Sequence, residues 1–248
     1  MNYKERATHW ILQEKYGKQI FSLPENDSRR LTKGEPADYI IGWSYFLGCK
    51  IDLSHKPLIP RPETEYWVGE AIRDISQTRK RSSRCLDIFA GSGCIGIALL
   101  KHLPKLTIDF ADVNPECLKQ IEINCEINGI AKDRFHIILS DIFANIKDRY
   151  DYVFGNPPYC ATKKNKRVAN SVIKFEPAQA LWGGDDGLIY IKKFLACAKK
   201  LLKPKGVIYM EFDDIQKGEA SKLIKGGGYG KYQFRKDQYG LWRWVTVR

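Results

Sequence analysis

Several features that define particular classes of protein are absent from this chain. None of its apolar runs approaches the ~18 residues of a membrane-spanning helix. Its first residues, MNYKERATHWILQEKYGKQ, mix charged with apolar side chains, which is not typical of an export signal. The sequence contains no internal repeat and no low-complexity segment. These absences favour a soluble, cytoplasmic protein that does not contact a membrane.

Closely paired cysteines are also absent. The seven cysteines include no CxxC pair, and several of them lie inside apolar runs. Zinc sites commonly use such pairs, and scattered cysteines in a chain without an export signal are typical of reduced thiols. We therefore expect a reducing cytosolic compartment and no metal site.

Positive charge, by contrast, is in excess. The formal net charge is +12, with six lysines between Lys192 and Lys205 and four basic residues in KKNKR at positions 163–167. Two interpretations stay open: these residues form solvated helix faces, or they form a surface for a polyanion or an acidic protein. The second would give the basic C-terminal half a weak contact with nucleic acid or the ribosome.

The apolar pattern predicts alternating strands and helices. With 248 residues and 44% hydrophobic content, the chain can bury one sizeable core. Strands are expected at residues 84–89, 106–113, 134–140, 150–155 and 206–212, and helices at 96–103, 115–129, 186–202 and 216–225. Pro204 should stop the helix at 186–202. The alternation indicates an α/β fold with a mostly parallel, doubly wound sheet, and a final hairpin (232–237 and 242–247) puts an antiparallel strand at its edge or within it.

Polar or glycine residues follow three of the expected strands, at the carboxyl ends where such sheets bind ligands. Gly91 and Gly93 allow close approach of the backbone, and Asp112 can accept both hydroxyls of a ribose. Asp141 and Ile142 suit the amino group and the ring face of an adenine. Together they predict a nucleoside ligand. A nicotinamide cofactor stays open at this point, because the glycines and Gly96 fit the G-x-G-x-x-G spacing.

A fourth strand end carries the stretch FGNPPYC. Asn156 offers a side-chain carbonyl, and Pro157 and Pro158 have no N–H, so the backbone here presents acceptors only. Tyr159 adds a flat face, and its hydroxyl has no role in this interpretation. Such a corner suits a planar group with an NH₂, held by the Asn156 carbonyl and the Pro157 carbonyl. With a methyl sulfonium opposite, it predicts an S-adenosylmethionine-dependent N-methyltransferase that works by positioning and electrostatics.

The chain resembles the protein-(glutamine-N5) methyltransferases of the HemK/PrmC type, which methylate the glutamine of the Gly-Gly-Gln motif in peptide chain release factors. The similarity runs from Tyr39 to the C-terminus. It includes YIIGWSYFLG, LIPRPETE, LDIFAGSGCIGIAL, DVNPECL, SDIF, GNPPYC, FEPAQAL, GGDDGL, LKPKGVIYMEF with Gln216, and KDQYGLWR. NPPY is shared with nucleic-acid amino-methyltransferases, whereas RPETE and FEPxxAL are more particular to this family.

The resemblance implies a seven-stranded, Rossmann-like class I S-adenosylmethionine-dependent methyltransferase sheet with a short helical N-terminal module. It implies S-adenosylmethionine as cofactor, S-adenosylhomocysteine as product, no metal, and a release factor as partner in translation termination. Cofactor residues are then Ala90, Gly91, Ser92, Gly93, Cys94, Asp112 and Ile142, with Asn156 near the methyl group and Asn156, Pro157, Pro158 and Tyr159 around the substrate amide. Ile142 departs from the pattern, since some relatives have an aromatic residue there.

The remaining expectations concern the domain boundaries and the N-terminal part of the chain. Residues 1–50 form a reduced recognition module with one amphipathic helix in ATHWILQEKYG, residues 51–83 a linker with RPETE and a helix, and residues 84–248 the catalytic domain. Arg61 and Glu63 are candidate substrate-binding residues; alternatively, they belong to a proline-fixed turn with an Arg–carboxylate bridge.

Two other functions stay open on the sequence alone. The first is an N6-adenine methyltransferase acting on RNA or DNA, which NPPY and the +12 charge suggest, although no long insert for base recognition is visible. The second is a non-catalytic binding module that keeps the fold. The presence of Asn156 and of both loop glycines argues against it.

Overall fold

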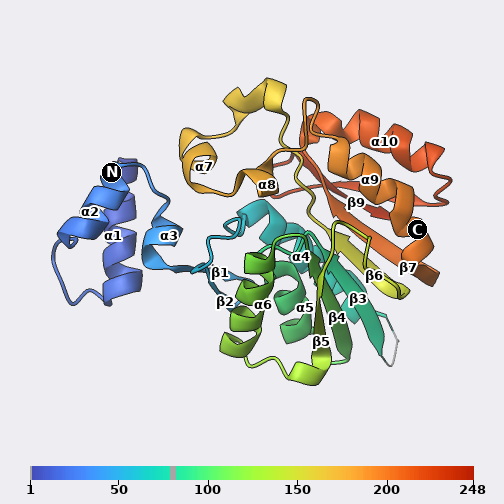
Figure 1. Ribbon diagram of the computed structural model, residues 1–248, viewed down its shortest axis with the longest axis horizontal. Coiled ribbons are helices and arrows are strands. Elements are labelled where there is room, and N and C mark those ends of the chain that lie inside the picture. Colours follow the sequence, from blue (N-terminus) through green and yellow to red (C-terminus); the bar gives the residue numbers. More distant parts are fainter. Residues whose placement is uncertain (1, 79–81) are drawn as a thin grey trace.

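The central feature of the computed structural model, which describes residues 2–78 and 82–248, is one seven-stranded sheet (Figure 1). Residues 79–81 of the predicted linker lie outside the described residues. The strands are β3 (Ser83–Ile88), β4 (Leu106–Asp112), β5 (Phe135–Leu139), β6 (Tyr150–Gly155), β7 (Leu202–Glu211), β8 (Tyr232–Lys236) and β9 (Trp242–Val247). Their order is β5-β4-β3-β6-β7-β9-β8, parallel except that β9 runs antiparallel to β7 and β8. The predicted fold is confirmed, with the hairpin strand β9 inside the sheet.

Helices cover both faces of this sheet (Figure 1). One face carries α4 (Pro62–Ser76), α5 (Cys94–His102) and α6 (Pro115–Ile127), and the other carries α9 (Ile189–Ala198) and α10 (Lys217–Gly226). Successive strand residues supply the two cores, because side chains alternate across a strand: Cys85 belongs to the first core and Leu86 to the second. Both residues are fully buried, so the continuous apolar runs read from the sequence are strands covered on both sides.

The predicted helix at 186–202 is wrong at its C-terminal end. The helix α9 ends at Ala198, a short 3-10 helix η3 (Lys199–Leu201) follows, and Pro204 lies inside β7. The register explains how a strand accepts this proline: Tyr150 of β6 pairs with Leu202, but Tyr152 pairs with Val207. The intervening residues of β7 therefore leave the ladder, and the missing N–H of proline costs no hydrogen bond there.

Gly96 shows what the third glycine of the G-x-G-x-x-G spacing does. A Cβ built on it would lie 2.1 Å from a ring carbon of Phe110, which is fully buried on β4. The glycine therefore lets α5 pack closely on the sheet, and its spacing to Gly91 and Gly93 does not by itself indicate a nicotinamide cofactor.

The N-terminal part contains three helices and a hairpin. The helices α1 (Tyr3–Tyr16), α2 (Glu25–Thr32) and α3 (Ala37–Ile41) share a separate small core beside the sheet (Figure 1). The predicted helix in ATHWILQEKYG corresponds to α1, which begins with a capping box between Asn2 and Glu5. The hairpin of β1 (Trp43–Phe46) and β2 (Cys49–Asp52) instead packs into the core under α4 to α6. The boundaries 1–50, 51–83 and 84–248 stay predictions.

Candidate active site

A cavity of about 260 Å³ opens at the carboxyl ends of β3 to β6. We call it the strand-end cavity. Its lining includes Thr64 of α4 and, at the strand ends, Phe89, Ala90, Gly91, Ser92, Cys94, Asp112, Ser140, Asp141, Ile142, Asn156 and Pro158. All predicted cofactor residues are among them except Gly93, which caps α5 with a left-handed backbone and lies against Ile121. The four strand ends thus meet as the sequence predicts.

Asp112 is held in place by the glycine loop. Its Oδ2 accepts from the Gly91 N–H at 2.9 Å, and its Oδ1 accepts from the Asn114 N–H at 2.9 Å. Gly91 has φ +55°, a conformation that glycine adopts without the Cβ clash of other residues. Burial raises the pKa of Asp112, while these backbone donors lower it. The carboxylate is therefore oriented before any ligand arrives, and each oxygen keeps a lone pair for a hydroxyl.

Two bulky residues of this cavity have an unusual backbone. Phe89 has φ 61° and Ile142 has φ 48°, in the left-handed region that costs non-glycine residues on the order of 1–3 kcal/mol. The turn at Ile142 is braced by Ser140, whose hydroxyl donates to the Ile142 carbonyl at 2.8 Å and accepts from the Asn145 N–H at 3.0 Å. Such strain persists where surrounding contacts impose it, which is typical of ligand sites. No sequence pattern indicated this backbone conformation.

Asn156 lies where the strand-end cavity meets a second cavity. Both cavities are lined by Asn156, Arg61, Leu58 and Ala180. Asn156 directly follows β6, and its Nδ2 lies 3.5 Å from the Thr64 hydroxyl oxygen of α4. A group bound in either cavity can therefore contact the same side chain.

The second cavity, of about 280 Å³, is lined by many ionisable side chains and is called the charged cavity. Its polar lining consists of Arg61, Glu63, Asn156, Tyr159, Lys164, Arg167, Asp213 and Arg243. Of the predicted substrate residues, Pro157 also lines it, whereas Pro158 lines the strand-end cavity. The structure thus brings RPETE and NPPY together, although the roles of their residues stay predictions.

Arg61 also forms the ion pair that the alternative interpretation expected. Its Nη2 lies 2.7 Å from Oε1 of Glu176, which is buried and also accepts from the Ile59 N–H at 3.0 Å. The contact joins two segments that are 115 residues apart, the start of α4 and the FEPAQAL stretch, whose last four residues form α8 (Ala178–Leu181). Arg61 therefore forms this ion pair and lines both cavities at the same time.

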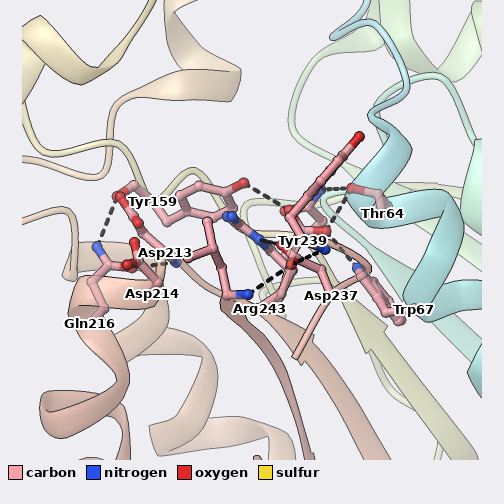
Figure 2. A network of polar contacts seen from close by, with 12 residues as sticks. Thr64, Trp67, Tyr159, Asp213, Asp214, Gln216, Asp237, Tyr239 and Arg243 are labelled. Carbon is pink, nitrogen blue, oxygen red and sulfur yellow. Dashed lines mark hydrogen bonds and ion pairs between the residues drawn. The ribbon is translucent and has the colours of Figure 1, made fainter. Parts of the chain in front are cut away.

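A buried carboxylate, Glu211, lies behind Asn156 and was not predicted. This last residue of β7 accepts from Thr64 Oγ1 at 2.6 Å, from Trp67 Nε1 at 2.6 Å and from the Tyr159 hydroxyl at 2.8 Å. Figure 2 shows Thr64 and Trp67 reaching this network from one side and Tyr159 from the other. Burial raises the pKa of Glu211, and the three donors lower it in part. A Glu that ends the apolar strand GVIYMEF was the available signal.

The Tyr159 hydroxyl therefore has a hydrogen-bond partner, which the sequence did not indicate. That only its ring face matters for the reaction stays a prediction. Burial and the Glu211 carboxylate raise the pKa of Tyr159. The carbonyl of Tyr159 is also used, because it accepts from Gln216 Nε2 at 2.9 Å (Figure 2). The NPPY corner is thus held in place by hydrogen bonds to Glu211 and Gln216.

Two of the expectations from the sequence concern metal ligands and cysteines. In residues 2–78 and 82–248 there is no group of three His, Cys, Asp or Glu side chains that could hold a metal ion. All seven cysteines are free, and burial raises the pKa of Cys94 and Cys117 to about 12. Within the same ranges, no helix has the length and apolar character needed to cross a membrane.

Comparisons with known proteins agree with this geometry. Residues 72–203 match the family described as "Methyltransferase small domain". The chain is 36% identical over 214 residues to the release factor glutamine methyltransferase of Lactococcus lactis, covering 86% of this chain and 77% of that protein. It is 33% identical over 231 residues to the enzyme of the same name from Thermodesulfovibrio yellowstonii, covering 93% and 82%.

Solved structures share the fold at lower identity. The hMettl16 catalytic domain, solved in complex with a hairpin, matches with a TM-score of 0.63 at 20% identity, covering 81% of this chain and 75% of that one. TYW2 from M. jannaschii, in complex with AdoMet, matches with a TM-score of 0.52 at 19% identity, covering 83% of each chain.

Proposed function

This chain belongs to the family of release factor glutamine methyltransferases, and from that premise we propose how it acts and on what. It transfers a methyl group from S-adenosylmethionine to the side-chain amide nitrogen (N5) of the glutamine in the Gly-Gly-Gln motif of a peptide chain release factor. The observation that carries this proposal is the position of Asn156, between a cavity with nucleoside-type residues and a cavity with charged residues.

The strand-end cavity suits S-adenosylmethionine, which supplies an electrophilic methyl group on a sulfonium. Asp112, Asp141 and Ile142 line this cavity. In the proposed complex, Asp112 accepts from the ribose hydroxyls, and Asp141 and Ile142 contact the adenine. The left-handed Gly91 leaves the backbone open to the amino-acid part of the cofactor. Ala90, Ser92 and Cys94 complete this wall, and Gly93 holds the turn from beneath it.

The charged cavity receives the glutamine side chain. An amide nitrogen is a poor nucleophile because its lone pair is delocalised into the carbonyl. Asn156 Oδ1 and the Pro157 carbonyl accept one N–H each, which holds the nitrogen in line with the methyl group and favours positive charge on it. The N–C bond forms as the C–S bond breaks, S-adenosylhomocysteine leaves, and one N–H proton passes to water.

A finer part of the proposal concerns the basic segment η2 (Thr162–Arg167) at the rim of the charged cavity. Some of its charge is neutralised locally, since Lys163 lies 2.9 Å from Asp185 and Arg167 lies 2.7 Å from Asp214. Its remaining charge supports a contact with an acidic release factor surface or with the ribosome. An N6-adenine methyltransferase is not favoured, because the relatives that cover most of the chain carry the release factor name.

The test is methyl transfer from labelled S-adenosylmethionine. Four reactions are compared: a release factor, the same factor with its Gly-Gly-Gln glutamine replaced by alanine, transfer RNA, and no added substrate. We expect label on the unaltered release factor only. Label on the RNA would support the adenine alternative, and no label in any reaction would overturn the proposal.

A further inference from the structure

The Asn156 side chain can fill its place in two orientations. Its carbonyl oxygen and amide nitrogen have nearly the same size, so shape alone does not decide which of them faces the cavities. The proposed reaction needs the oxygen there, because an amide N–H cannot accept a hydrogen bond from the substrate nitrogen. Something behind Asn156 must therefore select the orientation.

The buried Glu211 fixes the hydroxyl proton of Thr64. The indole N–H of Trp67 can only donate, so Glu211 Oε2, 2.6 Å away, acts as an acceptor. The Thr64 hydroxyl lies 2.6 Å from the same oxygen and donates its single proton to it. Thr64 and Glu211 are both buried, and Thr64 also lines the strand-end cavity.

With its proton committed, Thr64 Oγ1 can only accept from Asn156. The atom of Asn156 nearest to it is Nδ2, at 3.5 Å, and the flipped amide would place two acceptor oxygens side by side. We infer that Thr64, held by Glu211, is a positioning residue that turns the Asn156 carbonyl toward the substrate nitrogen. This inference rests on the proposed function, since only a substrate NH₂ requires that orientation.

Thr64 could instead serve only to stabilise the fold. A variant of Trp67 distinguishes this structural role from the positioning role. Trp67 donates to the same Glu211 oxygen over the same distance as Thr64, whereas it is Thr64 that lies next to the Asn156 amide. If Thr64 served only to satisfy the buried carboxylate, Trp67→Phe would reproduce the effect of Thr64→Val. The pair is therefore a matched set of variants.

The experiment measures kcat, KM for the release factor, cofactor affinity and Tm for Thr64→Val, Thr64→Ser and Trp67→Phe. Thr64→Val should lower kcat on the order of 10-fold to 100-fold, as expected for a misoriented group. Thr64 lines the strand-end cavity, but valine has nearly the same shape as threonine, so cofactor affinity should stay within about twofold. Thr64→Ser keeps the oxygen and should restore most of kcat. Trp67→Phe should lower Tm with little change in kcat. If Thr64→Val does not fold, Thr64→Ala removes the same oxygen and should give the same loss.

Three outcomes overturn the inference: equal losses of kcat in Thr64→Val and Trp67→Phe, a Thr64→Ser variant as slow as Thr64→Val, or a further loss when Thr64→Val is added to Asn156→Ala. Expected instead is a double variant no slower than Asn156→Ala alone. Full turnover in Asn156→Ala would overturn the proposed function itself. A slow Asn156→Ala beside a fast Thr64→Val would overturn the inference and leave the proposed function standing.

Discussion

The strand-end cavity and the charged cavity share Asn156 but differ in the side chains around it. Much of the strand-end cavity is lined by residues at or just after the ends of β3 to β6, with Asp112 and Asp141 as its acidic side chains. The charged cavity combines Glu63, Lys164 and Arg243, which line it alone and come from segments far apart in the chain. A small, fixed ligand can be held by neighbouring strand ends, whereas a protein substrate must be met by a wider surface.

The largest effect is expected at Asn156, the residue that lines both cavities. Replacing Asn156 by alanine removes the acceptor that both cavities need during methyl transfer. By analogy with single preorganised groups in other active sites, kcat should fall on the order of 10²–10³-fold while cofactor affinity changes little. Asn156→Asp keeps an acceptor but adds a negative charge near the sulfonium, so it should alter cofactor affinity as well. Calorimetry and single-turnover rates check both variants; a large loss of cofactor affinity in Asn156→Ala would place its main role in the strand-end cavity.

A second variant affects the strand-end cavity alone. Asp112→Ala removes a carboxylate whose hydrogen bonds to ribose hydroxyls contribute ~1.5–3 kcal/mol, so the cofactor Kd should rise roughly 10-fold to 100-fold. KM for the release factor should stay the same. Because the variant also frees the Gly91 and Asn114 N–H groups, Asp112→Asn is the control that can keep one of these bonds. Unchanged cofactor affinity in Asp112→Ala, measured by calorimetry, would refute its assignment to the ribose.

The same comparison explains what could be predicted from the sequence. Gly91, Asp112 and Asn156 each follow an apolar strand directly, and parallel strands bring their carboxyl ends to one edge of the sheet. Glu211 and Thr64 could not be paired in advance, since 147 residues separate them and no local pattern states which helix faces which strand end.

The prediction of where α9 ends failed for a different reason. Its apolar and lysine residues continue the helical pattern through residues 199–202, so periodicity alone could not separate the helix from the start of β7. The proline that was expected to stop the helix is instead tolerated inside the strand, where the pairing with β6 shifts its register.

A third prediction concerns the buried acid beneath the strand-end cavity. Asp87 accepts from the Gly96 N–H at 2.9 Å through Oδ2, and in the described part of the chain its buried Oδ1 has no hydrogen-bond partner. Burial raises the pKa of Asp87 to about 8 from an ordinary value of 3.8. The folded state therefore holds this proton more tightly than the unfolded state, so its contribution to stability is present below pH ~4 and is lost as pH rises toward 8.

Asp87→Asn removes this titration. Relative to the unaltered protein, the variant should gain at least ~1 kcal/mol in the free energy of unfolding between pH 4 and pH 8, because each pKa unit corresponds to about 1.4 kcal/mol. Denaturant unfolding at several pH values measures it. The exposed Asp148→Asn is the control for a general effect of losing one acidic residue. Parallel pH curves for Asp87→Asn and the unaltered protein would contradict the raised pKa.

The smallest effect is expected at the rim of the charged cavity. Arg167 is partly exposed and pairs with Asp213 at 3.3 Å and Asp214 at 2.7 Å, so solvent and these carboxylates weaken its field. Arg167→Ala should therefore raise KM for the release factor only about twofold to fivefold, with cofactor affinity unchanged. Lys222, whose exposed partner Glu219 lies on the same helix α10, supplies a matched control, and Lys222→Ala should leave KM unchanged.

Salt dependence tests the same charge in a second way. Raising the salt concentration should slow the unaltered enzyme at low substrate concentration, because charges more than ~8–10 Å apart are screened near physiological ionic strength. It should slow Arg167→Ala less. Equal salt dependence in the two Ala variants would mean that the charge at this rim does not guide the substrate, and that the charged cavity binds it through the contacts around Asn156 alone.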